Sequence, residues 1–268
     1  MNYNVEKSSS IKVMITCLVL TVSLSNCKVK KTIANTTTSI TIPVTKPPRR
    51  TLMFSGYEWV IKNPTGKMGP HANYWNGDNV WVDKKGRLHF TIKYNKTTDR
   101  WECSEVATIE KFGNGTYQWK IEGPVNALDR NIVFGLFNYS GRSTLDEMDI
   151  EFSRWGYANA PILNYTIWPA EKGGVKNVTY AKDFEMENKK MQTTHRWIRN
   201  SDKLVFESLH GFQDGKDNLF ETKTWTSENA SISKLDMPVL MNLWLFNNPP
   251  TDKKDVELIV HEFKFIKH

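Results

Sequence analysis

The sequence predicts an all-β domain, arranged as a β-sandwich or jelly roll. Short segments in which apolar and polar residues alternate recur at roughly ten-residue spacing, as strands of such folds do. No stretch of about a dozen residues has a convincing helical period. With 268 residues and a hydrophobic content of 39%, the chain can bury one large core.

The predicted strands can be placed in chain order. Residues 79–83 and 87–94 flank the turn 84–86, whose Lys-Lys-Gly sequence indicates a hairpin. Further strands are expected at 116–121, 131–139, 147–152, 203–207, 237–246 and 256–266. The runs 131–139 and 237–246 are continuously apolar, whereas the others alternate, and both patterns are typical of strands.

The positive charge of the chain is confined to its N-terminal end. Residues 1–50 contain eight Lys and Arg and one Glu, which accounts for the whole formal charge of +7. The remaining residues carry equal numbers of basic and acidic side chains, so they offer no basic excess to a phosphate backbone. We therefore expect no nucleic-acid partner.

Residues 1–26 have the pattern of an export signal. Lys7 and Lys12 precede an apolar run at 13–24 that is too short to span a bilayer comfortably. The Leu-Ser-Asn-Cys sequence at 24–27 resembles a bacterial lipobox, although Asn stands where Gly or Ala is usual. We expect cleavage before Cys27, which would carry lipid and anchor the protein to a membrane.

This signal sets the expected domain organisation. Residues 27–50, rich in Thr, Lys and Pro, would form a tether, and residues 51–268 would form the globular domain. The protein would be a lipoprotein at the cell envelope or surface; the alternative is an ordinary cleaved signal with an incidental Cys, and secretion. Once Cys17 has left with the signal and Cys27 carries lipid, Cys103 remains alone and no disulfide can form within the mature chain.

Three acidic residues alternate with apolar ones at 147–152. On a strand, Glu147, Asp149 and Glu151 share one face, while the apolar residues between them can be buried on the other. Two carboxyl groups that flank a glycosidic bond are the usual apparatus of glycoside hydrolysis, one as acid/base and one as nucleophile or base. The alternative is a solvated outer face of an antiparallel strand.

An ordered set of short motifs resembles glycoside hydrolase family 16, whose members are concanavalin-like jelly-roll endoglycanases. The likeness covers residues 57–267 and is carried by segments 78–82, 103–106, 113–117, 137–139, 146–152, 164–165, 194–195 and 241–244. It implies two antiparallel sheets with a concave substrate cleft. It also implies a polysaccharide as the partner, with neither a cofactor nor a catalytic metal, and we expect a monomer.

The resemblance assigns a role to each acidic residue. Glu147 matches the nucleophile, Glu151 the acid/base and Asp149 the auxiliary acid between them. The two Glu Cα atoms lie about 13 Å apart on an extended strand, so curvature and leaning side chains must bring the carboxyls together. The spacing without a bulge resembles the lichenase and xyloglucan-active branch, which implies a retaining endo-enzyme for β-1,4 or mixed β-1,3-1,4 glucans.

Substrate contacts are expected around these acids. Asn164, Asn242, Trp244 and Glu105 match positions that line the cleft in lichenase-like relatives. Other expected contacts are Phe137 and Tyr139 on a neighbouring strand, and Trp75, Trp155 and Trp168 as stacking platforms for sugar rings. The alternative for each is internal packing, and we expect His195 to be structural.

Two departures and two alternative functions remain. Leu145 stands where lichenases place a Trp, and Ala107 where many place an Arg, so sugar recognition must differ from that of a typical lichenase. A transglycosylase would use the same nucleophile, and the sequence does not separate it from a hydrolase. A non-catalytic glycan-binding sandwich is the third hypothesis, but such a module has no need for all three acids.

Overall fold

The computed structural model describes residues 49–171, 176–187 and 189–268. In this part of the chain the regular structure is β-strand, apart from the short 3-10 helix η1 (Gly77–Asn79). The predicted signal, Cys27 and all of the tether except its last two residues lie outside the described residues. Within those residues, no helix is long and apolar enough to cross a membrane.

The described residues form a succession of strands along the chain. They are β1 (Thr51–Phe54), β2 (Tyr57–Ile61), β3 (Tyr74–Trp75), β4 (Val80–Val82), β5 (Leu88–Asn95), β6 (Arg100–Phe112), β7 (Gly115–Glu122), β8 (Ile132–Tyr139), β9 (Glu147–Ser153), β10 (Leu163–Trp168), β11 (Val178–Lys182), β12 (Gln192–Arg199), β13 (Lys203–His210), β14 (Leu219–Thr226), β15 (Met237–Leu245) and β16 (Val256–Lys267). The predicted all-β fold is confirmed.

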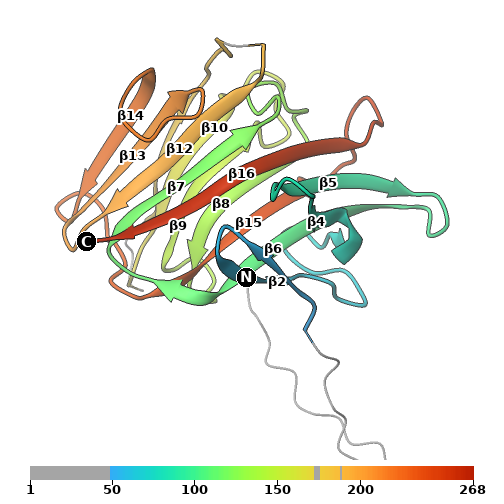
Figure 1. Ribbon diagram of the computed structural model, residues 1–268, viewed down its shortest axis with the longest axis horizontal. Helices are drawn as coiled ribbons and strands as arrows, with labels where there is room; N and C mark the ends of the chain where they lie inside the picture. The colour runs from blue at the N-terminus through green and yellow to red at the C-terminus, as the bar shows by residue number, and fades with distance from the viewer. Residues whose placement is uncertain (1–48, 172–175, 188) are drawn as a thin grey trace, which may run out of the picture. The chain divides into compact units, whose positions relative to one another are not determined.

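The strands pair into two layers. One layer, here called the acidic sheet, has the order β11-β10-β9-β8-β15-β6-β2-β1, and the other, the outer sheet, has the order β4-β5-β16-β7-β12-β13-β14. The layers join where β5 pairs with the first residues of β6. Apart from the parallel β3–β6 pair, the ladders between named strands are antiparallel. Figure 1 shows β16 and β7 crossing in front of β8 and β9.

The core fills the space between the two sheets. Tyr165 of β10 stacks on Phe206 of β13 with ring centroids 4.9 Å apart, and Trp59 of β2 meets Phe263 of β16 at 5.5 Å. On β9, Met148, Ile150 and Phe152 are fully buried. Because side chains alternate along a strand, the three acids of β9 lie on the face that points away from this core.

His195 belongs to the core, as we expected. Its ring is fully buried, packs edge-on against Phe152 at 4.8 Å, and shares a 2.6 Å hydrogen bond between Nδ1 and Ser208 Oγ. Burial lowers the pKa of His195 to about 3, so the ring is neutral. Its role is to pack between the sheets.

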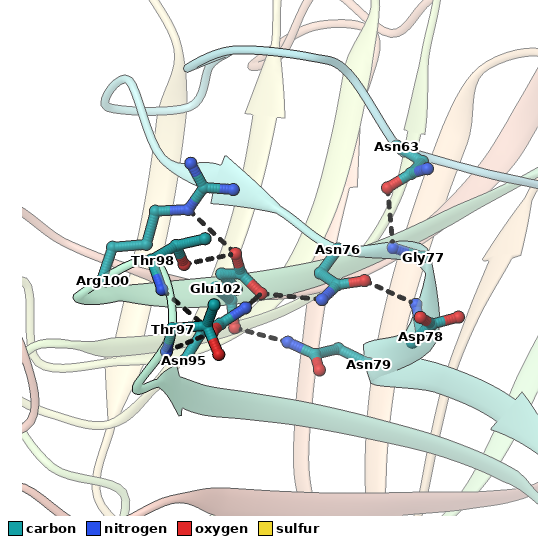
Figure 2. A network of polar contacts seen from close by, with 10 residues as sticks. All are labelled: Asn63, Asn76, Gly77, Asp78, Asn79, Asn95, Thr97, Thr98, Arg100 and Glu102. Carbon is teal, nitrogen blue, oxygen red and sulfur yellow. Dashed lines mark hydrogen bonds and ion pairs between the residues drawn. The ribbon is translucent and has the colours of Figure 1, made fainter.

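A polar cluster centred on Glu102 of β6 joins η1 and the residue before it to the β5–β6 hairpin (Figure 2). The Glu102 carboxylate accepts hydrogen bonds from Asn76 Nδ2 at 2.7 Å, Arg100 Nε at 2.8 Å and Asn95 Nδ2 at 3.1 Å. The Glu102 carbonyl accepts another from Asn79 Nδ2 at 2.7 Å. The cluster fixes the segment that carries β3 beside the acidic sheet.

Candidate active site

Strand β9 presents its three acids in a row between β8 and β10. Glu147 lies opposite Tyr139 on β8 and Trp168 on β10, and Asp149 lies opposite Phe137 and Thr166. Glu151 lies opposite Gly135 and Asn164. The structure thus brings Phe137, Tyr139, Asn164 and Trp168 beside the acids, on strands that register places next to them.

Burial keeps protons on the acidic row. Burial raises the pKa of Glu147 to about 8, and repulsion from Glu151 adds to the effect. Burial alone raises the pKa of Glu151 to about 7. The pKa of Asp149, which is 3% exposed, is raised well above its usual value by burial and by both Glu neighbours. The row therefore holds both protonated and ionised carboxyls near neutral pH.

Asp149 shares a hydrogen bond with its neighbour Glu147. A hydrogen bond between Asp149 and Glu147 raises the pKa of Asp149 and lowers that of Glu147, so the proton sits on Asp149 and Glu147 accepts it. Trp168 Nε1 donates to Asp149 Oδ2 at 3.0 Å and fixes the orientation of this carboxyl. Trp168, expected as a stacking platform, thus also orients an acid of the row.

A polar line continues from Glu151 across the sheet. Gly135 of β8 lies opposite Glu151, Asn242 of β15 lies opposite Gly135, and Glu105 of β6 lies opposite Asn242. Asn242 Nδ2 donates to Glu105 Oε2 at 3.2 Å. Glu105 and Asn242, both expected to contact substrate, are therefore joined to each other on the same face as Glu151.

Lys62 completes this line, and sequence reasoning missed it. Its Nζ lies 2.9 Å and 3.0 Å from the two carboxylate oxygens of Glu105, and 3.9 Å from the ring centroid of Trp75. Strand β2 pairs with β6 beside Ala107, and Lys62 follows directly after β2. Ala107, which stands where many lichenases have an Arg, was the one sequence signal that another residue would supply the positive charge beside Glu105.

The aromatic residues form a cluster beyond the Glu151 end of the row. Trp244 is 4% exposed, and the His71 imidazole stacks on it with centroids 5.4 Å apart. Trp155 is half-buried, meets Phe246 edge-on at 5.6 Å and donates from Nε1 to Asn164 Oδ1 at 3.3 Å. His71 and Trp155 both have a φ of 52°, so two left-handed backbone positions hold this cluster in place.

The remaining expected contacts are more enclosed. Trp75 is 3% exposed, and its Nε1 donates to Met68 O at 2.9 Å. The Asn164 Nδ2 group donates to the carbonyls of Ser153 and Ile162 at 2.9 Å and 3.0 Å, which ties the turn between β9 and β10. No three His, Cys, Asp or Glu side chains in the described part of the chain are grouped as a metal site would require.

Comparisons with known proteins place this geometry in a known fold. No family model and no curated protein matches the sequence. Among solved structures, the Bacillus licheniformis β-glucanase has a TM-score of 0.58 at 17% identity, over 78% of this chain and 92% of that one. A prokaryotic β-1,3-1,4-glucanase (lichenase) derived from a mouse hindgut metagenome has a TM-score of 0.56 at 16% identity, over 77% and 92%.

A third similar structure is described as a pseudo β-1,3-glucanase and immunostimulatory antigen of Mycobacterium tuberculosis, with a TM-score of 0.58, 16% identity, and coverage of 78% and 91%. The chain has the fold of glycoside hydrolase family 16. Identities of this size establish the fold alone, which agrees with the jelly roll expected from the motifs.

Proposed function

We propose that the chain is a retaining endo-β-glycosidase that hydrolyses a β-glucan with β-1,4 or mixed β-1,3-1,4 linkages. The observation that carries the proposal is the row of three buried or half-buried carboxyls on β9, which share one face and retain protons near neutral pH. Perturbed carboxyls grouped on one face of a glycosidase fold are candidates for acid–base and nucleophilic catalysis.

In the proposed reaction, the Glu147 carboxylate attacks the anomeric carbon while the Glu151 carboxyl gives its proton to the glycosidic oxygen. The bond to the departing chain breaks, and that chain leaves as an alcohol. A water molecule then attacks the same carbon, gives a proton to Glu151 and releases Glu147. The two displacements together retain the anomeric configuration.

Asp149 supports the assignment of Glu147 as nucleophile and Glu151 as acid/base. A protonated Asp149 donates to Glu147 and stabilises the nucleophile as an anion. Burial raises the pKa of both Glu147 and Glu151, and positive charge that develops on the sugar ring in the transition state favours the ionised form of the carboxyl beside it. An ionised Glu147 and a protonated Glu151 are therefore the pairing that the transition state stabilises.

The substrate class rests on the unbulged spacing of Glu147, Asp149 and Glu151, and on two similar structures that are a β-glucanase and a β-1,3-1,4-glucanase. A transglycosylase would form the same intermediate on Glu147 and differ only in the acceptor. The pseudo β-1,3-glucanase of M. tuberculosis favours a second candidate, a glycan-binding sandwich without turnover. The three acids support the enzyme over the binding module.

The decisive experiment is product analysis after incubation with lichenan, barley β-glucan, xyloglucan, agarose and carrageenan. We expect internal cleavage of at least one of the three glucans, with newly formed reducing ends that are first β and then mutarotate in proton NMR spectra. Clear cleavage of agarose or carrageenan alone would refute the substrate class and leave the mechanism standing. Binding without any cleavage would favour the glycan-binding module.

We also propose that Cys27 is a lipid anchor, so that the enzyme works at the cell envelope or surface. A Cys27→Ser variant should be released from membranes, or keep its signal, while the activity of the domain from residue 51 onward stays the same. Fractionation of cells and mass spectrometry of the mature N-terminus measure this. A soluble wild-type protein that begins away from Cys27 would refute the anchor.

A further inference from the structure

Lys62 is enclosed beside the proposed active site, and its hydrogen bonds are already used. Its side chain is 10% exposed, and Nζ donates to both oxygens of Glu105 and to Gly69 O at 2.7 Å. An ammonium group has three N–H donors, so these contacts satisfy it. Lys62 can therefore act on a ligand only through the groups that it holds.

The contacts of Lys62 set the direction of the next hydrogen bond. An ammonium group only donates and a carboxylate only accepts, so Glu105 can receive a hydrogen bond from the Asn242 amide solely through its NH2 group. This is the arrangement observed, with Asn242 Nδ2 3.2 Å from Glu105 Oε2. The amide oxygen of Asn242 must then point away from Glu105, along the sheet toward Glu151.

Gly135 makes room for this oxygen. A Cβ atom at Gly135 would lie 2.6 Å from Asn242 Oδ1, so the oxygen sits directly over the glycine. Glu151 lies opposite Gly135 on the next strand, β9, and the backbones of the two strands are about 5 Å apart. Asn242 is 3% exposed, and its Oδ1 has no hydrogen-bond partner among the described residues. A buried acceptor of this kind is costly unless a donor reaches it.

We propose that Lys62 is a positioning residue that, through Glu105, fixes Asn242 Oδ1 as an acceptor for one free hydroxyl of the sugar unit bound beside Glu151. The inference rests on the proposed function and sharpens its substrate class. The site selects a neutral sugar with an unsubstituted hydroxyl at that position. A sulfate ester, a methyl ether or a carboxylate offers no donor there and is rejected.

The test compares Lys62→Met with Lys62→Arg, which keeps the charge. Lys67→Met is the matched control, because Lys67 lies on the same connection and over the ring of Tyr74 but is exposed. For each variant, kcat and KM are measured on soluble barley β-glucan and on the same polymer partially O-methylated. Thermal melting curves report whether each variant is folded.

The wild-type protein and Lys67→Met should prefer the unmodified polymer by at least about tenfold in kcat/KM, the size expected when a buried polar group loses its partner. In Lys62→Met the Glu105 carboxylate loses both contacts to Nζ and no longer holds the Asn242 amide in one place, so Oδ1 is not fixed against the sugar hydroxyl. We expect a raised KM on the unmodified polymer and a preference that falls toward one, and we expect Lys62→Arg to restore most of it. If the role of Lys62 were purely structural, Lys62→Met would lower kcat/KM by the same factor on both polymers and leave the preference unchanged.

Calorimetric binding of the same two polymers to Glu147→Gln separates this inference from the proposed function. If the wild-type protein does not cleave but discrimination in binding depends on Lys62, hydrolysis is refuted and the positioning role stands. If the wild-type protein cleaves and Lys62→Met discriminates as well as wild type, the positioning role is refuted and hydrolysis stands. Absence of both binding and cleavage overturns both.

Discussion

Two groups of enclosed carboxyls on the acidic sheet differ in how their charge is stabilised. Glu102 of β6 is 3% exposed; burial alone would raise its pKa, but hydrogen bonds from Asn76, Asn95 and Arg100 outweigh burial and lower it. The acids of β9 are also buried or half-buried, yet their pKa values are all raised. Burial is common to both, so the donors around Glu102 and the like charges within the row of β9 decide the sign of the pKa shift.

The supply of donors follows from the local chain. Glu102 faces a turn and a hairpin that are rich in Asn, Thr and Arg, and Figure 2 shows these side chains converging on it. The acids of β9 lie opposite three aromatic residues, one glycine, Thr166 and Asn164, and Trp168 Nε1 is the one N–H donor seen on their carboxyls in the described part of the chain. A carboxyl that is fully satisfied holds structure together, whereas one that is left short of donors is available for chemistry.

The largest expected effect separates the two groups by activity. Glu151→Gln should lower kcat by about 10²- to 10⁴-fold, because the variant cannot transfer the proton. Glu147→Ala should be at least as inactive, and azide should partly restore turnover by filling the vacated space. Steady-state kinetics on the best substrate and far-UV circular dichroism measure this. Near wild-type activity in both variants would show that the row is not catalytic.

The next largest effect separates Glu102 from the acids of β9 by their contribution to the free energy of unfolding. Glu102→Ala should lower the free energy of unfolding by about 2–4 kcal/mol, because Asn76 and Asn95 lose the acceptor that compensates their burial. Glu147→Gln should cost far less, since it relieves repulsion within the row. Urea denaturation at pH 7 compares the two variants. A loss below about 0.5 kcal/mol for Glu102→Ala would contradict the structural role.

The smallest effect concerns the pH dependence of stability, where the two groups have opposite signs. The folded pKa of Glu147 is raised from 4.5 to about 8, so stability present below pH 4.5 is lost as the pH rises through 8. The pKa of Glu102 is lowered, so its contribution is present above 4.5 and lost as the pH falls.

Glu147→Gln should therefore flatten the alkaline side of the stability curve, by on the order of 2 kcal/mol. Glu102→Gln should instead flatten the acid side. Melting temperatures from pH 3 to pH 9 measure both. If both variants changed the melting temperature on the same side of the pH range, Glu147 and Glu102 would not differ in the sign of their pKa shifts.

Much of the fold was predictable because one face of most strands is buried. Alternation at 147–152 fixed which side chains point to the core and which share the opposite face, and the structure agrees. Strand β6, the longest, was not predicted as a strand because the buried polar residues Glu102, Ser104 and Glu105 interrupt its apolar pattern. Their partners lie on other strands, and a local pattern carries no information about them.

The site was predictable only as far as strand register extends. Phe137, Tyr139 and Asn164 lie beside the acids because their strands pair with β9. Lys62 could not be found in this way, since its contact with Glu105 spans 43 positions and the stretch around it shows no motif. Trp75 shows the converse, because it packs under the Lys62 ammonium rather than against the acidic row.

The most direct test of the central claim, that Glu147 is the nucleophile of a retaining glycosidase, is to trap the covalent intermediate. The wild-type protein is incubated with an activated 2-deoxy-2-fluoro β-glucan oligosaccharide, which forms the glycosyl-enzyme but hydrolyses it slowly. Peptide mass spectrometry should then find one sugar adduct, on Glu147, and none in the Glu147→Gln variant. An adduct on Glu102 or Glu151, or turnover with inverted configuration and no adduct, would contradict the account.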